Sequence, residues 1–128
     1  MKIEKPWGYE ILLTTPDLPY TGKILHVEAG KRCSLQYHDQ KTETLTLIRG
    51  QARLLLDDKE IDMETDKGYQ INPMQKHRYT AITDCDLVEH SSPEVGNTIR
   101  MEDDYQRGTE FEEERNLYRS QIKSGMTK

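Results

Sequence analysis

The stretch that decides both fold and site runs from residue 30 to residue 50 and reads GKRCSLQYHDQKTETLTLIRG. Gln36 and His38 are two residues apart, so on a strand their side chains face the same way. Residues 39–42 can form a short connection, after which Glu43 begins the next strand. The pattern therefore predicts that an amide, an imidazole and a carboxylate lie close together where two strands meet.

A second histidine extends this set. His77 follows a turn expected at residues 72–76 and opens a later strand. Imidazole nitrogens, carboxylate oxygens and amide oxygens all ligate divalent cations. We therefore expect one metal site, with room left for water or a sugar oxygen, formed by Gln36, His38, Glu43 and His77. The alternative, from spacing alone, is that four polar residues at strand ends are merely solvated.

The rest of the chain reads as short strands separated by Gly, Pro and Asp breakers. Alternation and β-branched residues predict nine strands: 9–14, 23–28, 34–38, 44–49, 52–57, 60–64, 69–72, 78–82 and 87–90. This spacing is typical of an all-β sandwich or barrel, and no βαβ pattern is present.

The C-terminal segment differs in composition from the body. Residues 1–108 form the predicted domain, whereas residues 109–128 are acidic and then basic. Thr109 and Glu112 have the spacing of a capping box, which predicts one short C-terminal helix. The alternative is a solvated or disordered tail.

Length and charge restrict the class of protein. A chain of 128 residues corresponds to one domain, and a net charge of −5 argues against nucleic acid as a partner. The sequence has no apolar run long enough to span a membrane and no stretch typical of a signal peptide, so we expect a cytoplasmic protein. Cys33 and Cys85 are too few for a disulfide scaffold and are expected to be buried thiols.

The residues of the first stretch resemble the first motif of the cupin superfamily. That motif runs Gly, five residues, His, one residue, His, four residues, Glu, six residues, Gly. The chain matches every spacing with Gly30, Gln36, His38, Glu43 and Gly50, and Gln36 replaces the first histidine. The glutamine is similar to that of the type II mannose-6-phosphate isomerase domain.

Three further segments are similar to that isomerase domain, namely Lys5–Glu10 (KPWGYE), Ser34–His38 (SLQYH) and Ile99–Arg107 (IRMEDDYQR). The resemblance covers residues 2–108 and implies an all-β fold of the cupin type, a double-stranded β-barrel. It also implies isomerisation of mannose 6-phosphate to fructose 6-phosphate through an enediol. The cofactor implied is one divalent metal ion, zinc by family resemblance, with manganese, cobalt or nickel also suited to the donor set.

The reaction needs a base and cations for the phosphate. Lys41, Glu89 and His90 are the candidate catalytic residues, and His26 is a further one; only one of Glu89 and His90 should face inward on a regular strand. A structural or solvated role is the alternative for each. Arg100 and Arg107 lie in the segment Ile99–Arg107 that is similar to the isomerase domain, and they are candidates for phosphate binding. The alternative is that they are surface residues paired with residues 102–104. Trp7 is a candidate for contact with the sugar, or packs the open edge of the barrel.

Two departures leave other functions open. The second motif of the family is Pro-x-Gly-x-x-His, and its alignment on His77 puts Met74 at the glycine position. Since a side chain at positive φ is costly, we expect a changed turn before His77. Lys41 stands where the family has arginine. The competing function is a cupin that holds a metal or a sugar without turnover. A dioxygenase-like reaction is a third reading, although Gln36 argues against it. The resemblance also implies a homodimer, which would suit a small core.

Overall fold

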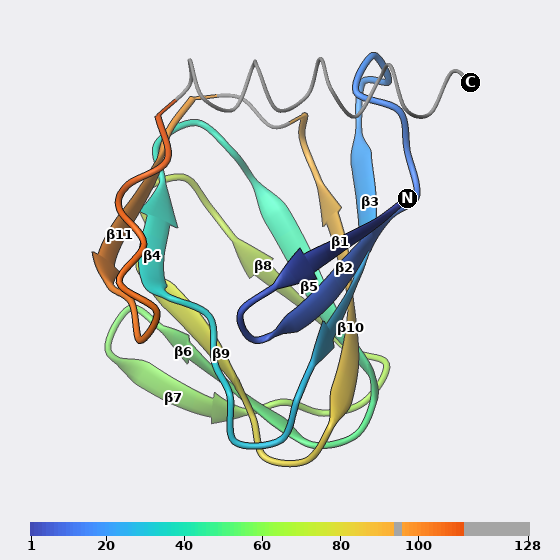
Figure 1. The fold of residues 1–128 in the computed structure, drawn as a ribbon, viewed down its shortest axis with the longest axis vertical. Coiled ribbons are helices and arrows are strands. Elements are labelled where there is room, and N and C mark those ends of the chain that lie inside the picture. Colours follow the sequence, from blue (N-terminus) through green and yellow to red (C-terminus); the bar gives the residue numbers. More distant parts are fainter. Residues whose placement is uncertain (94–95, 112–128) are drawn as a thin grey trace.

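The computed structural model describes residues 1–93 and 96–111, which fold into two antiparallel sheets (Figure 1). In chain order the strands are β1 (Lys2–Lys5), β2 (Gly8–Leu12), β3 (Thr21–Val27), β4 (Leu35–His38), β5 (Glu43–Arg49), β6 (Ala52–Leu56), β7 (Lys59–Asp62), β8 (Gly68–Ile71), β9 (His77–Ala81), β10 (Cys85–Ser91) and β11 (Thr98–Glu102).

The two sheets face each other as a flattened barrel. The larger sheet has the order β1-β2-β3-β10-β5-β8, and the smaller has the order β11-β4-β9-β6-β7. In Figure 1, β4 and β11 lie on the left and β3 and β10 on the right; β4, which carries Gln36 and His38, belongs to one sheet and its successor β5 to the other. The connection at residues 39–42 therefore crosses from sheet to sheet.

The inner faces of the sheets form the core. Leu87 on β10 lies directly between Leu25 on β3 and Leu47 on β5, and all three are almost completely buried. Each such side chain contributes about 1.5–3 kcal/mol by leaving water. Along each strand these inward residues alternate with outward-facing ones, which is the two-residue period expected of a half-buried sheet. Buried polar residues, described below, are present beside this apolar core.

All nine predicted strands are present, and each of their ends lies within two residues of the predicted one. The all-β fold is confirmed. Two strands were missed, β1 and β11. Lys2–Lys5 has only one apolar residue and forms a strand by pairing with β2, while Thr98–Glu102 forms one by pairing with β4. Both are therefore products of tertiary pairing rather than of local pattern.

The predicted C-terminal helix lies largely outside the described residues. Thr109 to Phe111 are not helical, and Glu110 pairs with Thr98 through two backbone hydrogen bonds of 2.9 Å. Among the described residues, no helix has the length and hydrophobicity needed to cross a bilayer. Both cysteines are buried free thiols, as predicted.

Candidate metal centre

Three of the four predicted ligands converge at the inner ends of their strands. His38 ends β4, Glu43 begins β5 and His77 begins β9. One donor atom from each lies within 4.8 Å of the others, and all three residues are buried. This His/Glu/His group could hold a metal ion, as the spacing of the sequence predicts.

The donor atoms of the two histidines are turned toward the carboxylate. Glu43 Oε1 lies 3.1 Å from His77 Nε2 and 3.6 Å from His38 Nε2, and neither Nε2 makes a hydrogen bond. Buried polar atoms without a hydrogen bond are rare and costly. A cation bound between these atoms would satisfy all of them, so the residues present fit the metal that the fold implies.

The second ring nitrogen of each histidine, Nδ1, contacts another polar group of the protein. Nδ1 of His77 lies 3.0 Å from the carbonyl oxygen of Gln75, and Nδ1 of His38 lies 2.9 Å from Oγ1 of Thr98. Because a carbonyl oxygen only accepts, His77 carries a hydrogen on Nδ1, and Nε2 is the nitrogen that faces Glu43. Such outer contacts orient metal-ligating imidazoles.

The protonation states also suit a cation. Burial, and then the nearby Lys41 ammonium, lower the pKa of His38 to about 4, so its ring is neutral at neutral pH. Burial alone would raise the pKa of Glu43, but Lys41 and the two histidines outweigh burial and hold this pKa well below its usual value. The site therefore presents a neutral His38 imidazole and an ionised Glu43 carboxylate, the forms that bind metals.

Gln36, the fourth predicted ligand, lies beside the group. It is directly opposite His77 in the pairing of β4 with β9, which puts both side chains on one face. The hydroxyl of Ser34 donates a hydrogen bond to its Oε1, and Gln36 lines the pocket described next. Its place as a ligand remains a prediction.

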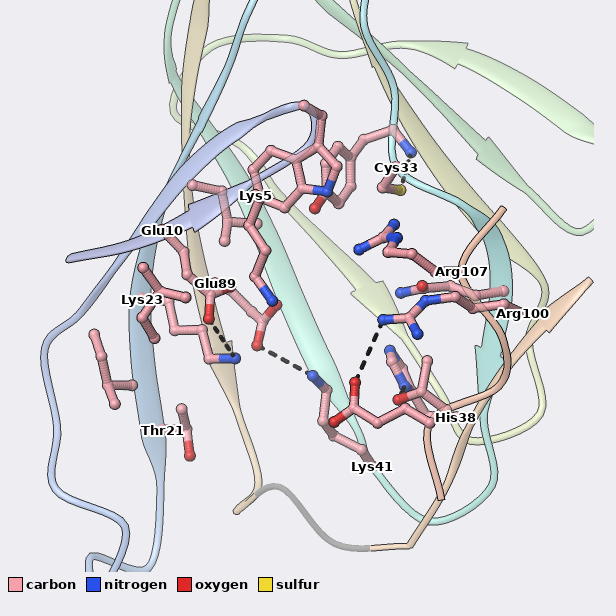
Figure 2. Close-up of a pocket in the computed structure, with 18 of the residues that line it drawn as sticks. Lys5, Glu10, Thr21, Lys23, Cys33, His38, Lys41, Glu89, Arg100 and Arg107 are labelled. Atoms are coloured by element: carbon pink, nitrogen blue, oxygen red, sulfur yellow. Dashed lines mark hydrogen bonds and ion pairs between the residues drawn. The ribbon is translucent and has the colours of Figure 1, made fainter. Parts of the chain in front are cut away.

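A pocket of about 730 Å³ opens above these residues. Figure 2 shows Lys41 and His38 at its floor, Arg100 and Arg107 on one wall and Glu10, Lys23 and Glu89 on the other. Its lining holds five cationic side chains and four carboxylates, namely Lys5, Lys23, Lys41, Arg100 and Arg107, and Glu4, Glu10, Glu89 and Glu110.

The candidate bases separate into inner and outer residues. Glu89 is buried and lines the pocket, whereas His90 is exposed, so the prediction that only one of the two faces inward is confirmed. Lys41 is 3% exposed and lies at the pocket floor. His26 is not among the pocket residues, because its ring pairs with Asp86 at 2.6 Å and stacks on Tyr9.

The three predicted substrate-binding residues all line the pocket. Arg100 donates a 2.7 Å hydrogen bond to the carbonyl oxygen of Gly108 and a 3.4 Å bond to Glu110, and Arg107 is bound to the carboxylate of Asp103. Trp7 is 4% exposed and packs edge-on against the ring of Tyr79.

The turn before His77 keeps a positive φ. Met74 has a φ of 71°, and its N–H donates a 2.7 Å hydrogen bond to the carbonyl oxygen of His38. The expectation that methionine would change this conformation is wrong. The exposed Met74 side chain points to solvent, so the left-handed conformation costs backbone energy but causes no burial conflict.

The sequence analysis missed one residue that contacts the candidate metal centre. Thr98 contacts the candidate ligand His38 through its hydroxyl, and its position opposite His38 comes from the register of β4 with β11. No local signal marks such a residue, because the contact joins positions 60 apart in the chain.

Several solved structures share this fold. KdgF from Halomonas sp. superposes with a TM-score of 0.68 at 11% identity over 74% of this chain and 87% of its own. A cupin 2 domain-containing protein from Halorhodospira halophila superposes with a TM-score of 0.66 at 16% identity, over 77% of this chain and 80% of its own. Ectoine synthase from P. lautus superposes with a TM-score of 0.65 at 14% identity, over 72% of this chain and 68% of its own. At these identities the similarity concerns the fold alone.

Sequence comparison gives a family but no match among curated proteins. No curated protein sequence matches the chain. The family profile described as Cupin domain matches residues 23–89, which include all of β4 to β9, most of β3 and β10, and the three converging candidate ligands. That match spans more than half of the 128 residues, and the chain belongs to the cupin family.

Proposed function

We propose that this cupin is a metal-dependent aldose–ketose isomerase acting on a sugar phosphate, of the mannose 6-phosphate to fructose 6-phosphate type. The observation that carries the proposal is the position of Glu89. Its buried carboxylate lines the same pocket as His38 and is linked to the ligand Glu43 through Lys41, which lies 3.3 Å from each carboxylate. A base beside a Lewis-acid site is what a proton shift between two carbons requires.

The metal would be held by His38, Glu43 and His77, with Gln36 as a fourth ligand, and would polarise the carbonyl and hydroxyl oxygens of the substrate. Zinc suits nitrogen and oxygen donors, and manganese, cobalt and nickel are the alternatives.

Glu89 acts as the proton acceptor. It takes the proton from the carbon that bears the hydroxyl, the C–H electron pair becomes the double bond of the enediol, and the π pair of the C=O bond moves to the carbonyl oxygen, which takes a proton from solvent water. Glu89 then returns its proton to the former carbonyl carbon as the C=C π pair forms the new C–H bond. The other enediol hydroxyl gives its proton back to solvent, and its O–H electron pair forms the new carbonyl bond. Lys41 is unsuited to this role, since the carboxylates on either side of it stabilise its ammonium form.

Arg100 and Arg107 would bind the phosphate, and Trp7 would line the sugar-binding part of the pocket. Arg100 donates to Gly108 and Glu110, so a phosphate would compete with the Glu110 carboxylate for this guanidinium. The exchange is favourable where two arginines converge on one dianion.

The test is a coupled assay of mannose 6-phosphate and fructose 6-phosphate interconversion by protein loaded with each of the four metals. We expect Glu89→Gln to lower kcat by about 100-fold or more while metal content is unchanged. Glu60→Gln, which alters an exposed carboxylate on β7, is the control and should keep full activity. Absence of turnover by metal-loaded protein on a panel of sugar phosphates, or full activity in Glu89→Gln, would contradict the proposal.

One observation favours a second function, a cupin that binds a sugar without turnover. Four pocket cations already contact carboxylates of the protein, in the pairs Lys23–Glu10, Lys41–Glu89, Arg100–Glu110 and Arg107–Asp103. This lowers the positive charge offered to a phosphate and would suit a neutral sugar. Calorimetry distinguishes the two functions, since the binding function predicts that metal-loaded protein binds mannose as tightly as mannose 6-phosphate.

The same proposal includes a homodimer. Ile11, Ile24 and Val88 lie side by side on the outer face of the larger sheet, and the outward residue next in that row is Thr46. This uncharged band stands out in a chain with 32% charged residues, and a second copy of the same band is its most complementary partner. Light scattering should give a dimer for the wild type and a monomer for Ile24→Glu; a wild-type monomer would refute it.

A further inference from the structure

Lys41 occupies an unusual position for a lysine. Its side chain is 4% exposed, and its Nζ lies 3.3 Å from Glu43 Oε2 and 3.3 Å from Glu89 Oε2. It comes from the connection that crosses between the sheets, two residues before the ligand Glu43 (Figure 2). Burying an ammonium group is expensive unless carboxylates surround it, so the arrangement needs a reason.

The two oxygens of Glu43 have different surroundings. Oε1 faces both imidazoles, at 3.1 Å from His77 Nε2 and 3.6 Å from His38 Nε2. Oε2 makes no hydrogen bond and faces the Lys41 ammonium instead. A cation between the two imidazoles would therefore meet Oε1, whereas Oε2 is already engaged by a positive charge.

We propose that Lys41 is a positioning residue that restricts Glu43 to single-oxygen ligation and holds Glu89 away from the cation. The inference rests on the metal centre of the proposed function. Carboxylates bind divalent cations through one or two oxygens, and any nearby carboxylate without a cationic partner can join the ligand set. By engaging both, Lys41 leaves coordination positions open for substrate oxygens, which a catalytic site needs.

This role predicts an effect of opposite sign to that of a merely structural lysine. If Lys41 only supported the fold, its loss would loosen the ligands and weaken metal binding. If it restrains two carboxylates and repels the cation, its loss should strengthen metal binding while the site becomes crowded. Metal affinity without any substrate therefore separates the two roles.

The experiment compares wild type with Lys41→Met, Lys41→Arg and Lys23→Met, using zinc alone in a chelator competition at pH 7.5. The visible absorption of the cobalt-substituted proteins reports coordination number. Lys23→Met is the matched control, because Lys23 also lines the pocket and pairs with a carboxylate, Glu10, at 3.7 Å. The double variant Lys41→Met/Glu89→Gln removes the buried ammonium and one of the carboxylates that contact it together, and it covers the case in which Lys41→Met does not fold.

We expect Lys41→Met to bind zinc about tenfold more tightly, and the double variant to bind more tightly than wild type by a smaller factor. The cobalt absorption should weaken in Lys41→Met as coordination number rises. Lys41→Arg and Lys23→Met should stay close to wild type. Equal or weaker zinc binding in both Lys41→Met and the double variant would overturn the inference alone, whereas failure of the wild type to bind any cation would overturn the metal centre itself.

Discussion

The unsatisfied atoms of the metal centre predict that a divalent cation raises the stability of the fold. Two buried imidazole nitrogens, Nε2 of His38 and of His77, make no hydrogen bond. Each such atom costs about 1–3 kcal/mol, so the metal-free fold carries a penalty of roughly 2–6 kcal/mol at this site. A cation that binds only the folded state recovers stability as RT ln(1 + [L]/Kd), about 2.7 kcal/mol at a hundredfold excess over Kd.

That gain in the free energy of unfolding corresponds to a measurable rise in Tm. For a domain of this size 1 kcal/mol corresponds to about 3–5 °C in Tm, so saturation should raise Tm by about 10 °C. Differential scanning fluorimetry of chelator-treated protein, titrated with zinc, manganese, cobalt and nickel, measures it. Glu43→Gln keeps the shape of the side chain but removes the charge that faces both imidazoles, and we expect it to lose most of the shift.

The control is Glu60→Gln, an exposed carboxylate on β7, which should keep the full shift. The reasoning would be refuted by an unchanged Tm of the wild type with all four metals, or by a shift in Glu43→Gln as large as in the wild type. In the first case the orphaned nitrogens would need another explanation, and in the second the cation would bind elsewhere.

Three further predictions follow from single positions. Met74→Gly should be more stable than Met74→Ala by about 0.5–1 kcal/mol in urea unfolding, because only glycine relieves the positive φ of 71°, and the reverse order would contradict this. Since the pKa of His38 falls to about 4 on folding, the unfolded chain binds more protons below pH 6.5; stability of the metal-free protein should therefore fall by up to about 1.4 kcal/mol per unit between pH 6.5 and 4. Urea unfolding over that range should show a shallower slope for His38→Gln but not for the exposed His90→Gln. Leu87→Ala, at a position with no exposed area, should cost about 2–5 kcal/mol, and a loss below 1 kcal/mol would show that the core does not centre on this row.

The sequence predicted those parts of the molecule that depend on local periodicity. Alternation predicted the strands of both sheets, and the two-residue step from Gln36 to His38 with the short connection to Glu43 predicted the approach of the ligands. Local pattern could not predict β1, because its charged sequence becomes a strand only by pairing with β2. Nor could it predict Thr98 beside His38, which depends on the register of β4 with β11.

The roles of Lys41 and Glu89 show where sequence reasoning reaches its limit. Alternation indicates that one of Glu89 and His90 faces inward, but the pairing of β10 with β3 and β5 decides that it is the carboxylate. The location of Lys41 in a connection carries no periodicity, and its burial between two carboxylates follows only from the closure of the sheets over residues 39–42. Lys41 and Glu89 are both candidate bases in the sequence. In the fold, Lys41 is a buried cation and Glu89 is a carboxylate that contacts it. Their difference in chemistry comes from tertiary electrostatics, and the different responses expected of the two variants test it directly: Lys41→Met should tighten zinc binding, whereas Glu89→Gln should lower turnover with metal content unchanged.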